Sequence, residues 1–300
     1  MTDHATETLP NLTQRVHTLG LIGDFIRKQP LGAAGGLVIA AMFFAAIFAE
    51  FVATHSPTEI DFFARLVPPS ADHLLGTDGF GRDIFSRVVH GARTAMTVGF
   101  VAAFVGTSLG ATLGVFSAFM GGWVDLAIQR FIDVMLSFPI IVMALIVVAI
   151  VPRSDLFGVD VNVIIAIAIP FIPKVARVIR SAALSIVTMP YIDATRAAGY
   201  SRLRIMFRHI MPNVLAPYLI MLTALLGQAI LLEASLSFLG LGVSEPTPAW
   251  GLMLSGTNAD YYREGWWVIF FPGLAISLAV FGFNLFGDSL RDWLDPRLKV

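Results

Sequence analysis

Apolar residues run along this chain in six long blocks, each about as long as a membrane-crossing helix. A helix needs roughly 20 mostly apolar residues to cross the hydrocarbon core of a bilayer. Few charges interrupt the blocks, and most polar residues lie between them. The pattern therefore predicts an all-α polytopic membrane protein with about six transmembrane helices. The predicted spans are 31–54, 95–120, 126–151, 161–179, 214–239 and 266–286.

Composition supports a membrane environment. Apolar residues make up 56% of the chain and charged residues 14%, whereas soluble domains are usually about 45–50% apolar and about 25% charged. A water-soluble core cannot hide so much apolar surface, so we expect a lipid bilayer to be the main solvent. The net charge of −1 gives no overall field that attracts nucleic acid, and the lack of cysteine excludes disulfides and thiolate metal sites.

Lysine and arginine cluster before the first span, between the fourth and fifth spans, and after the sixth. Six crossings place these segments on one side, and basic residues near span ends are retained in the cytoplasm. We therefore expect both termini in the cytoplasm, an uncleaved first span, and Trp266 and Trp267 at the outer interface. The predicted segments are a cytoplasmic segment 1–30, the first span 31–54, an external loop 55–94 with an amphipathic helix, a transmembrane core 95–290, and a cytoplasmic tail 291–300.

Small residues and prolines mark special points within the spans. Gly106, Gly110 and Gly114 form a stripe along which another helix can approach closely, either inside one bundle or across a dimer seam. Prolines in the third and fourth spans remove backbone hydrogen bonds and favour kinks, which suit both a rocking and a static bundle. These are Pro139, Pro170 and Pro173.

The most informative connection joins the fourth and fifth spans, within residues 188–213. Residues 191–198 are predicted to form a short helix, which Gly199 ends in the left-handed conformation that glycine adopts at little cost. Ser201 is a good N-cap for a second helix, which is predicted to run to about Ile210 and to stop at Pro212. We name this pair of helices the elbow.

The second helix of the elbow is predicted to be amphipathic, with apolar side chains on one face and arginines over the remainder. One interpretation is a helix lying on anionic lipid, and the other is a docking surface for a partner protein. The sequence leaves both open. The apolar residues are Leu203, Met206, Phe207 and Ile210, and the arginines are Arg202, Arg204 and Arg208.

The external stretch contains a turn punctuated by Gly76, Gly79 and Gly81. Asp83 is placed to begin a helix that we expect to lie along the outer interface. The G-x-x-x-x-G-K-[ST] arrangement of a phosphate-binding loop is absent, so a structural rim is the favoured interpretation. The apolar residues expected to share one face of that helix are Ile84, Phe85, Val88 and Val89.

Glu233 is an ionisable residue within the fifth predicted span. Such residues are costly in lipid and usually face a bundle interior or water. Glu233 is interpreted either as a pore or gate residue or as a local cap that bonds backbone groups near the span end. With Ser235 and Ser237 it forms the candidate pore or gate set.

Known catalytic patterns are missing from the sequence. The six histidines are scattered without H-E-x-x-H spacing, and neither a G-x-S-x-G elbow nor a phosphate-binding loop occurs. We expect no catalytic residue and no metal site, and we expect transport energy to come from partner subunits. Two other classes remain open. A secondary transporter acting alone usually shows inverted repeats, which are not seen, and an intramembrane enzyme needs a catalytic dyad at membrane depth.

Asp193-Ala194-Thr195, followed by Gly199 and Ile210-Met211-Pro212, resembles the coupling loop of ABC importer permeases, usually written E-A-A, three residues, G, and a later I-x-L-P. Asp stands in place of Glu, Thr in place of the second Ala, and Ile210 lies one place late. Other segments resemble the C-type permeases of dipeptide, oligopeptide and nickel importers (DppC/OppC-like), and the likeness extends from about residue 29 to 300. These segments are 73–87, 234–242, 246–251, 271–276, 284–292 and 294–297.

The resemblance implies a type I ABC importer permease fold in the inner membrane. Such a permease forms half of a translocation pathway and pairs with a second, B-type permease, two ATPase subunits and an external solute-binding protein, for which the external rim is a candidate seat. ATP and Mg would be bound by the ATPases, and no cofactor is expected in this chain. The solute is not readable among dipeptides, oligopeptides, glutathione, nickel complexes, opines and oligosaccharides. The implied ATPase-coupling residues of the 191–210 loop are Asp193, Ala194, Arg196, Gly199, Leu203, Met206 and Phe207.

Overall fold

A computed structural model describes residues 18–156, 159–256 and 263–294. Its long helices are α2 (Pro30–Ile47), α4 (Ile84–Met120), α5 (Gly122–Leu136), α7 (Val161–Val187), α10 (Leu215–Phe238) and α13 (Trp267–Leu294). Shorter helices are α1 (Thr18–Lys28), α3 (Ala49–Val52), η1 (Phe62–Ala64), α6 (Ile140–Ile150), α8 (Pro190–Ala197), α9 (Arg202–Ile205), η2 (Met206–Ile210), η3 (Met211–Val214) and α11 (Trp250–Met253). A two-residue hairpin of β1 (Asp155–Leu156) and β2 (Val159–Asp160) precedes α7.

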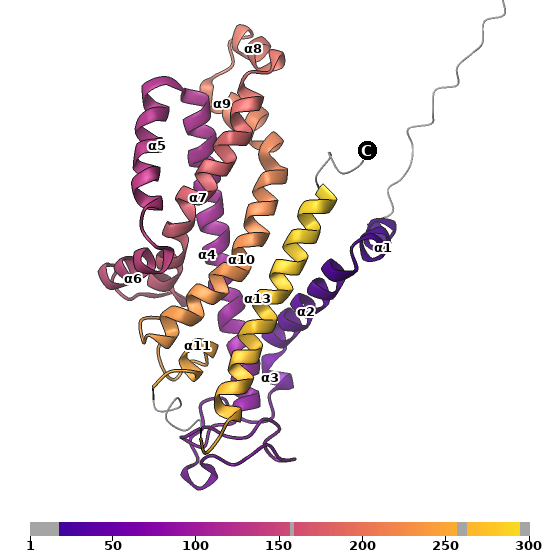
Figure 1. Ribbon diagram of the computed structural model, residues 1–300, viewed down its shortest axis with the longest axis vertical. Helices are drawn as coiled ribbons and strands as arrows, with labels where there is room; N and C mark the ends of the chain where they lie inside the picture. Colours follow the sequence, from indigo (N-terminus) through magenta and orange to yellow (C-terminus); the bar gives the residue numbers. More distant parts are fainter. Residues whose placement is uncertain (1–17, 157–158, 257–262, 295–300) are drawn as a thin grey trace, which may run out of the picture.

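The helices α4, α7 and α10 form the centre of the bundle, with α2 and α13 on one side and α5 and α6 on the other (Figure 1). The glycine stripe of α4 is where α7 packs. A Cβ added at Gly106 would lie 2.7 Å from the Ala168 carbonyl oxygen, and one at Gly114 would lie 2.6 Å from the Ala176 carbonyl oxygen. The stripe therefore serves close packing inside one bundle, which was one of its two interpretations.

Within the described residues, five helices are long and apolar enough to cross a membrane: α2, α4, the run from α9 through α10, α7 and α13. The third predicted span is instead a bent pair, because α5 and α6 meet at 96°. The bend falls where Pro139 caps α6, since a proline cannot donate the hydrogen bond that would continue α5. Pro170 and Pro173, by contrast, lie inside the continuous helix α7.

The expectation of a separate amphipathic helix before the second span was wrong. Asp83 does begin a helix, but α4 runs unbroken to Met120, so residues 84–94 form no separate amphipathic helix along the interface. No proline interrupts this segment, and Ile84 and Val89 are buried against the rest of the bundle. Trp267 is buried too, and its indole N–H donates to the Thr77 carbonyl oxygen at 3.1 Å. Of the two tryptophans, Trp266 alone is exposed.

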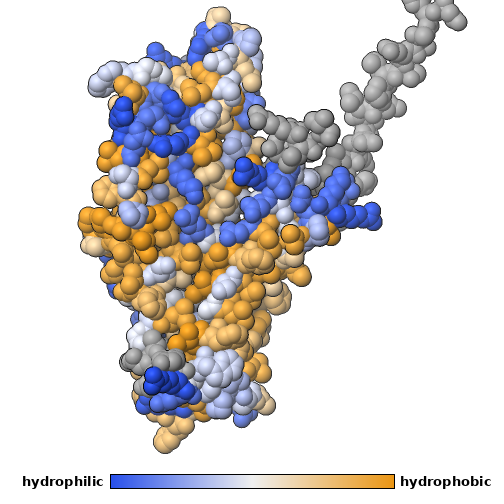
Figure 2. All heavy atoms as spheres, in the orientation of Figure 1, coloured by the Kyte–Doolittle hydropathy of each residue, from blue (hydrophilic) through white to orange (hydrophobic). Residues whose placement is uncertain are grey.

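The two ends of the bundle carry different connections. The elbow, α1 and the last turn of α13 lie at one end, while residues 53–83 and α11 lie at the other (Figure 1). Figure 2 shows hydrophobic side chains over the middle of the visible face and hydrophilic ones toward both ends. The described basic segments thus gather at one end, as the loop charges predicted. Arg15, Arg297 and Lys299 lie outside the described residues.

Candidate functional site

The first half of the elbow is a short helix that is anchored on one side and exposed on the other. Pro190 occupies its first turn, where the missing N–H costs nothing, and Ile192 is fully buried beneath it. On the exposed side, Arg196 donates to Asp193 at 3.1 Å, and its guanidinium lies 5.5 Å from the ring centroid of Phe119 at the end of α4. These contacts fix α8 against the bundle.

The turn at the centre of the elbow has the predicted geometry. Gly199 has a φ of +77°, in the left-handed region, and its N–H donates to the Arg196 carbonyl oxygen at 3.0 Å. Ser201 then caps the next helix, because its hydroxyl accepts the Arg204 N–H at 3.4 Å. A glycine and a serine two residues apart therefore set the angle between α8 and α9.

The second half of the elbow does not stop at Pro212, contrary to the prediction. The chain passes from α9 through the π-helical turn η2 and the 3₁₀ turn η3 directly into α10. The wide and tight turns accommodate the proline, whose N–H is missing, without ending the helical path. The Asn213 side chain donates to the His209 carbonyl oxygen at 2.6 Å and so satisfies a backbone acceptor there. The elbow is mechanically continuous with the fifth span.

The apolar residues of the elbow do not share one face, which corrects the second prediction about this helix. Met206 and Ile210 are buried with Ile205, whereas Leu203 is 66% and Phe207 53% exposed. The π-helical turn shifts the residues after Ile205 out of 3.6-residue register, so the predicted stripe splits. Six of the seven candidate coupling residues are exposed, and Met206 belongs to the core. The exposed six are Asp193, Ala194, Arg196, Gly199, Leu203 and Phe207.

We define the elbow surface as Tyr191, Tyr200, Leu203 and Phe207, all of which are exposed large side chains. Tyr200 is held from two sides, because the Arg204 guanidinium lies 4.3 Å from its ring centroid and the His209 ring stacks at 5.9 Å. The elbow surface is thus partly preorganised.

Two of the three candidate pore residues, Glu233 and Ser237, are buried within the described part of the bundle. Glu233 is 0% exposed, and its Oε1 accepts the Ser237 hydroxyl at 2.7 Å. The Ser237 oxygen also accepts the Val243 N–H at 3.3 Å, so these groups bond one another and the chain just beyond α10. Glu233 therefore bonds a side chain rather than the backbone groups that the local-cap interpretation named, and Ser237 links it to the backbone N–H of Val243.

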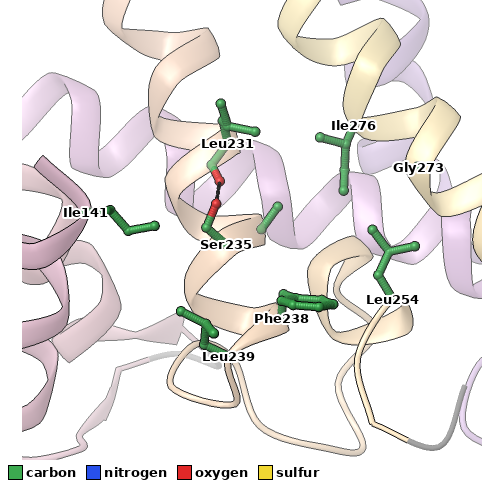
Figure 3. Close-up of a pocket in the computed structure, with 9 residues that line it drawn as sticks. Ile141, Leu231, Ser235, Phe238, Leu239, Leu254, Gly273 and Ile276 are labelled. Carbon is green, nitrogen blue, oxygen red and sulfur yellow. Dashed lines mark hydrogen bonds between the residues drawn. The ribbon is translucent and has the colours of Figure 1, made fainter. Parts of the chain in front are cut away.

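Ser235 lies on the opposite face of α10 and lines a cavity of about 470 Å³. Figure 3 shows this cavity between α6, α10, the segment after α11, and α13, with Ser235 bonded back to the Leu231 carbonyl oxygen. The remaining lining is apolar and includes Ile141, Phe238 and Ile276. This face of α10 therefore suits contact with apolar groups.

A second cavity, of about 240 Å³, is lined by the charged side chain of Lys174. The sequence pattern identified this lysine only as one of the basic residues that predict membrane orientation. Lys174 lies at the middle of the 27-residue helix α7, is exposed, and lines this cavity with Gln228 and the α5–α6 bend. Among the described residues no acidic group forms an ion pair with Lys174. A lysine this deep in an apolar span normally faces water or a bundle interior. The predicted span ended at residue 179 and so placed Lys174 near its end, whereas α7 continues to Val187 and places Lys174 at its middle.

Ion pairs tie α5 to α7. Arg180 donates from Nε to Asp125 at 2.6 Å, and Arg177 contacts Asp133 one turn earlier along α7. Asp125 also accepts the hydroxyl of Ser117 at the end of α4. Because α5 is otherwise largely exposed, these pairs fix its position against α4 and α7.

Comparison with known proteins gives consistent matches along the chain. Residues 110–300 match the family described as the inner membrane component of binding-protein-dependent transport systems. Residues 24–69 match the N-terminal transmembrane domain of oligopeptide transport permease C. The dipeptide transport system permease protein DppC of Alkalihalophilus pseudofirmus is 43% identical over 274 residues, covering 91% of this chain and 88% of that protein.

Other relatives are similar to nearly the same extent. A probable D,D-dipeptide transport system permease protein of Escherichia coli is 40% identical, and a glutathione transport system permease protein of Pectobacterium atrosepticum is 38% identical; each match covers 91% of this chain and 89% of that protein. An inward-facing structure of the MetNI methionine ABC transporter has a TM-score of 0.53 at 19% identity, covering 69% of this chain and 96% of that chain. The latter likeness shows the fold. None of these matches supports a secondary transporter.

Proposed function

Since this chain belongs to the inner membrane components of binding-protein-dependent transport systems, we propose that its elbow docks on a cytoplasmic ATPase subunit and carries the movement of that subunit into the membrane helices. The chain is a multi-pass permease subunit of an ABC importer, and separate subunits hydrolyse ATP in this family. The proposal concerns which of its residues couple the two parts.

The observation that carries this proposal is the exposed pair Leu203 and Phe207, one helical turn apart on a segment continuous with α10. Exposed apolar side chains beside arginines are typical of the centre of a protein interface. The elbow projects from the end of the bundle, beyond the hydrophobic middle (Figures 1 and 2). That position favours a protein partner over the alternative, in which the same residues lie on lipid.

We place the elbow, α1 and the end of α13 in the cytoplasm, and residues 53–83 outside. Arg27 and Lys28 at the end of α1, together with the arginines of the elbow, support this orientation. The second permease would pair along α5, where Trp123, Phe131 and Val134 are exposed apolar residues in the single chain. The full assembly would hold two permeases and two ATPases and would receive solute from a binding protein outside.

The transported solute is proposed to be a peptide or a peptide-like compound, because the relatives are named for dipeptides, D,D-dipeptides and glutathione. The cavity around Lys174 supports a path along α7 and α10, since a cation there can meet the carboxylate that every such solute carries. Ser235 and its apolar cavity would form the next part of that path.

The decisive experiment uses single cysteines, which are clean probes because the chain has no native cysteine. Ala198→Cys and Tyr200→Cys are combined in turn with a thiol-reactive crosslinker in intact cells that hold the whole importer. We expect each to capture an ATPase subunit. Phe63→Cys, on an exposed outer residue, is the matched control and should instead react with an impermeant maleimide added outside.

Two results would contradict the proposal. One is that neither Ala198→Cys nor Tyr200→Cys ever captures an ATPase subunit although both proteins support uptake. The other is that the impermeant maleimide labels these two positions and spares Phe63→Cys, which would invert the orientation.

A further inference from the structure

Two histidines and a buried aspartate meet at the end of the bundle opposite the elbow. They come from three different segments: His55 follows α3, His73 lies in the loop after η1, and Asp83 is the N-cap of α4. One ligand atom from each lies within 4.8 Å of the other two. The sequence spacing predicted no metal site, because 18 and 10 residues separate these positions in the chain and no motif links them.

The separations fit a bound ion. The His73 Nδ1 lies 3.0 Å and the His55 Nδ1 3.8 Å from the same carboxylate oxygen, Oδ1 of Asp83. Zinc binds imidazole nitrogen and carboxylate oxygen at roughly 2.0–2.2 Å in tetrahedral geometry, which places ligand atoms about 3.4 Å apart. The observed distances lie on either side of this value. Without an ion, His73 bonds Asp83 directly, and the His55 Nδ1 lies 3.0 Å from the Thr54 hydroxyl, which itself donates to Oδ2 of Asp83 at 3.5 Å. A bound ion would replace the first of these contacts and the bond between His55 and Thr54.

The rest of the Asp83 carboxylate is already fixed. Its Oδ2 accepts the Ser86 N–H at 2.8 Å and the Ser86 hydroxyl at 2.7 Å, which leaves Oδ1 directed at the two imidazoles. The His55 N–H donates to the same Ser86 hydroxyl at 3.0 Å, so the backbone on both sides of the cluster is anchored to one serine. Supporting hydrogen bonds of this kind hold metal ligands in place.

Nearby cations do not neutralise this carboxylate. Arg82 pairs with Asp78 at 2.7 Å and with Glu245 at 2.9 Å. Arg87 donates to the Pro57 carbonyl oxygen at 2.9 Å. Among the described residues the two imidazoles are therefore the side chains that face Oδ1 of Asp83, which is 1% exposed.

The cluster opens to solvent through a cavity of about 180 Å³, which gives an ion a path of entry. His55 is 40% exposed at the mouth of this cavity, and Glu59 and Asp61 line it. These acids and water supply further oxygen donors. Two imidazoles with one carboxylate favour a divalent transition metal over Ca²⁺ or Mg²⁺, which prefer oxygen ligands alone.

We propose that His55, His73 and Asp83 bind one divalent transition-metal ion of the Zn²⁺ class. The ion replaces the direct His73–Asp83 hydrogen bond and joins three segments: the exit of the first span, the outer loop and the start of α4. The site is independent of the elbow and of the transported solute.

The test uses the full-length chain, purified in lipid nanodiscs through a tag without histidine and stripped with a chelator. Co²⁺ is the probe, because its visible absorption bands report nitrogen and oxygen ligation directly. We expect saturable binding of one Co²⁺, displacement by Zn²⁺, and a rise in the unfolding temperature when Zn²⁺ is added. His55→Gln and His73→Gln should each weaken binding by at least about tenfold, the smallest loss seen when even a supporting partner is removed.

His90→Gln is the matched control, because His90 lies on the first turns of α4 and bonds only the Ser86 carbonyl oxygen through Nδ1. It should bind Co²⁺ like the native chain. If His73→Gln fails to fold, Asp83→Asn replaces it in the test. This variant keeps a side-chain oxygen that can cap α4, and it should also weaken Co²⁺ binding. No saturable Co²⁺ spectrum in the native chain, or unchanged binding in the folded His55→Gln protein, would overturn the proposal.

Discussion

The elbow and the outer cap, by which we mean residues 53–83, connect helices at opposite ends of the same bundle but are built in opposite ways. In the elbow, most polar contacts join residues three to five apart, although the Asn213 side chain donates to the Tyr191 hydroxyl 22 residues away. In the outer cap, charged residues are buried and bond to distant partners: Arg82 donates to Glu245, 163 residues away, and Trp267 donates to Thr77, 190 residues away. The buried charges of the cap therefore depend on distant parts of the chain, whereas the polar contacts of the elbow are mostly local. Both regions expose large apolar side chains, such as Phe207 in the elbow and Phe63 in the cap.

This contrast indicates where each region finds its stabilising contacts. A segment whose polar groups are satisfied locally and whose apolar groups are not covered is suited to a partner that comes and goes. A segment whose charges are buried and paired across the fold depends on the chain itself, because an unpaired buried charge is costly. Substitutions in the elbow should therefore change transport, and those in the cap should change stability.

The largest expected effect is in the elbow. Gly199→Glu should abolish uptake while the protein remains inserted, because the left-handed φ of +77° strains any side chain with a Cβ and a carboxylate would enter the docking surface. Steric overlap does not contribute to this loss of uptake, since a Cβ at position 199 meets no atom within 4 Å. Solute uptake and membrane abundance are the measurements. Gly199→Asn, which tolerates this conformation, is the control and should retain uptake. Normal uptake by Gly199→Glu would remove the elbow from the coupling mechanism.

The next largest effect is expected on the stability of the outer cap. Asp78→Ala should lower the free energy of unfolding by about 3 kcal/mol, because it leaves the buried Arg82 without the partner at 2.7 Å. Asp193→Ala is the matched elbow variant: Asp193 is 69% exposed in its ion pair, and such pairs contribute at most about 1 kcal/mol. Thermal and denaturant unfolding of both purified variants would measure this. Equal destabilisation would erase the proposed difference between the two regions.

A smaller effect separates the two sets of apolar residues within the elbow. Leu203→Ala combined with Phe207→Ala should reduce uptake by about tenfold without changing the unfolding temperature, since both side chains are exposed. Ile205→Ala removes a buried side chain and should instead lower stability by about 2–4 kcal/mol. Uptake and unfolding are measured together for both proteins. Loss of stability in the double variant would show that these residues pack internally.

The smallest effect is expected at Glu233. Glu233→Gln should leave uptake unchanged, because an amide oxygen can still accept the Ser237 hydroxyl in the buried local network. Lys174→Gln is the contrasting variant and should lower uptake severalfold, since it removes the positive charge from the α7 cavity. Initial uptake rates at several solute concentrations would compare them. A large defect in Glu233→Gln would restore it as a gate residue.

The sequence alone determined the features that depend on neighbouring residues. Long apolar runs gave the membrane spans, and Gly199 and Ser201 gave the turn and cap of the elbow, because both effects act within one helical turn. The motifs around Asp193 and along residues 73–87 were enough to indicate the family that the comparisons then showed.

Only the tertiary structure decided which of these residues are covered. Met206 and Leu203 are both apolar and three residues apart, yet packing against the bundle buries the first and leaves the second exposed. Packing likewise placed Lys174 beside a cavity and brought His55 and His73 to the carboxylate of Asp83. Burial and proximity depend on contacts between residues far apart in the chain, and no local pattern contains that information.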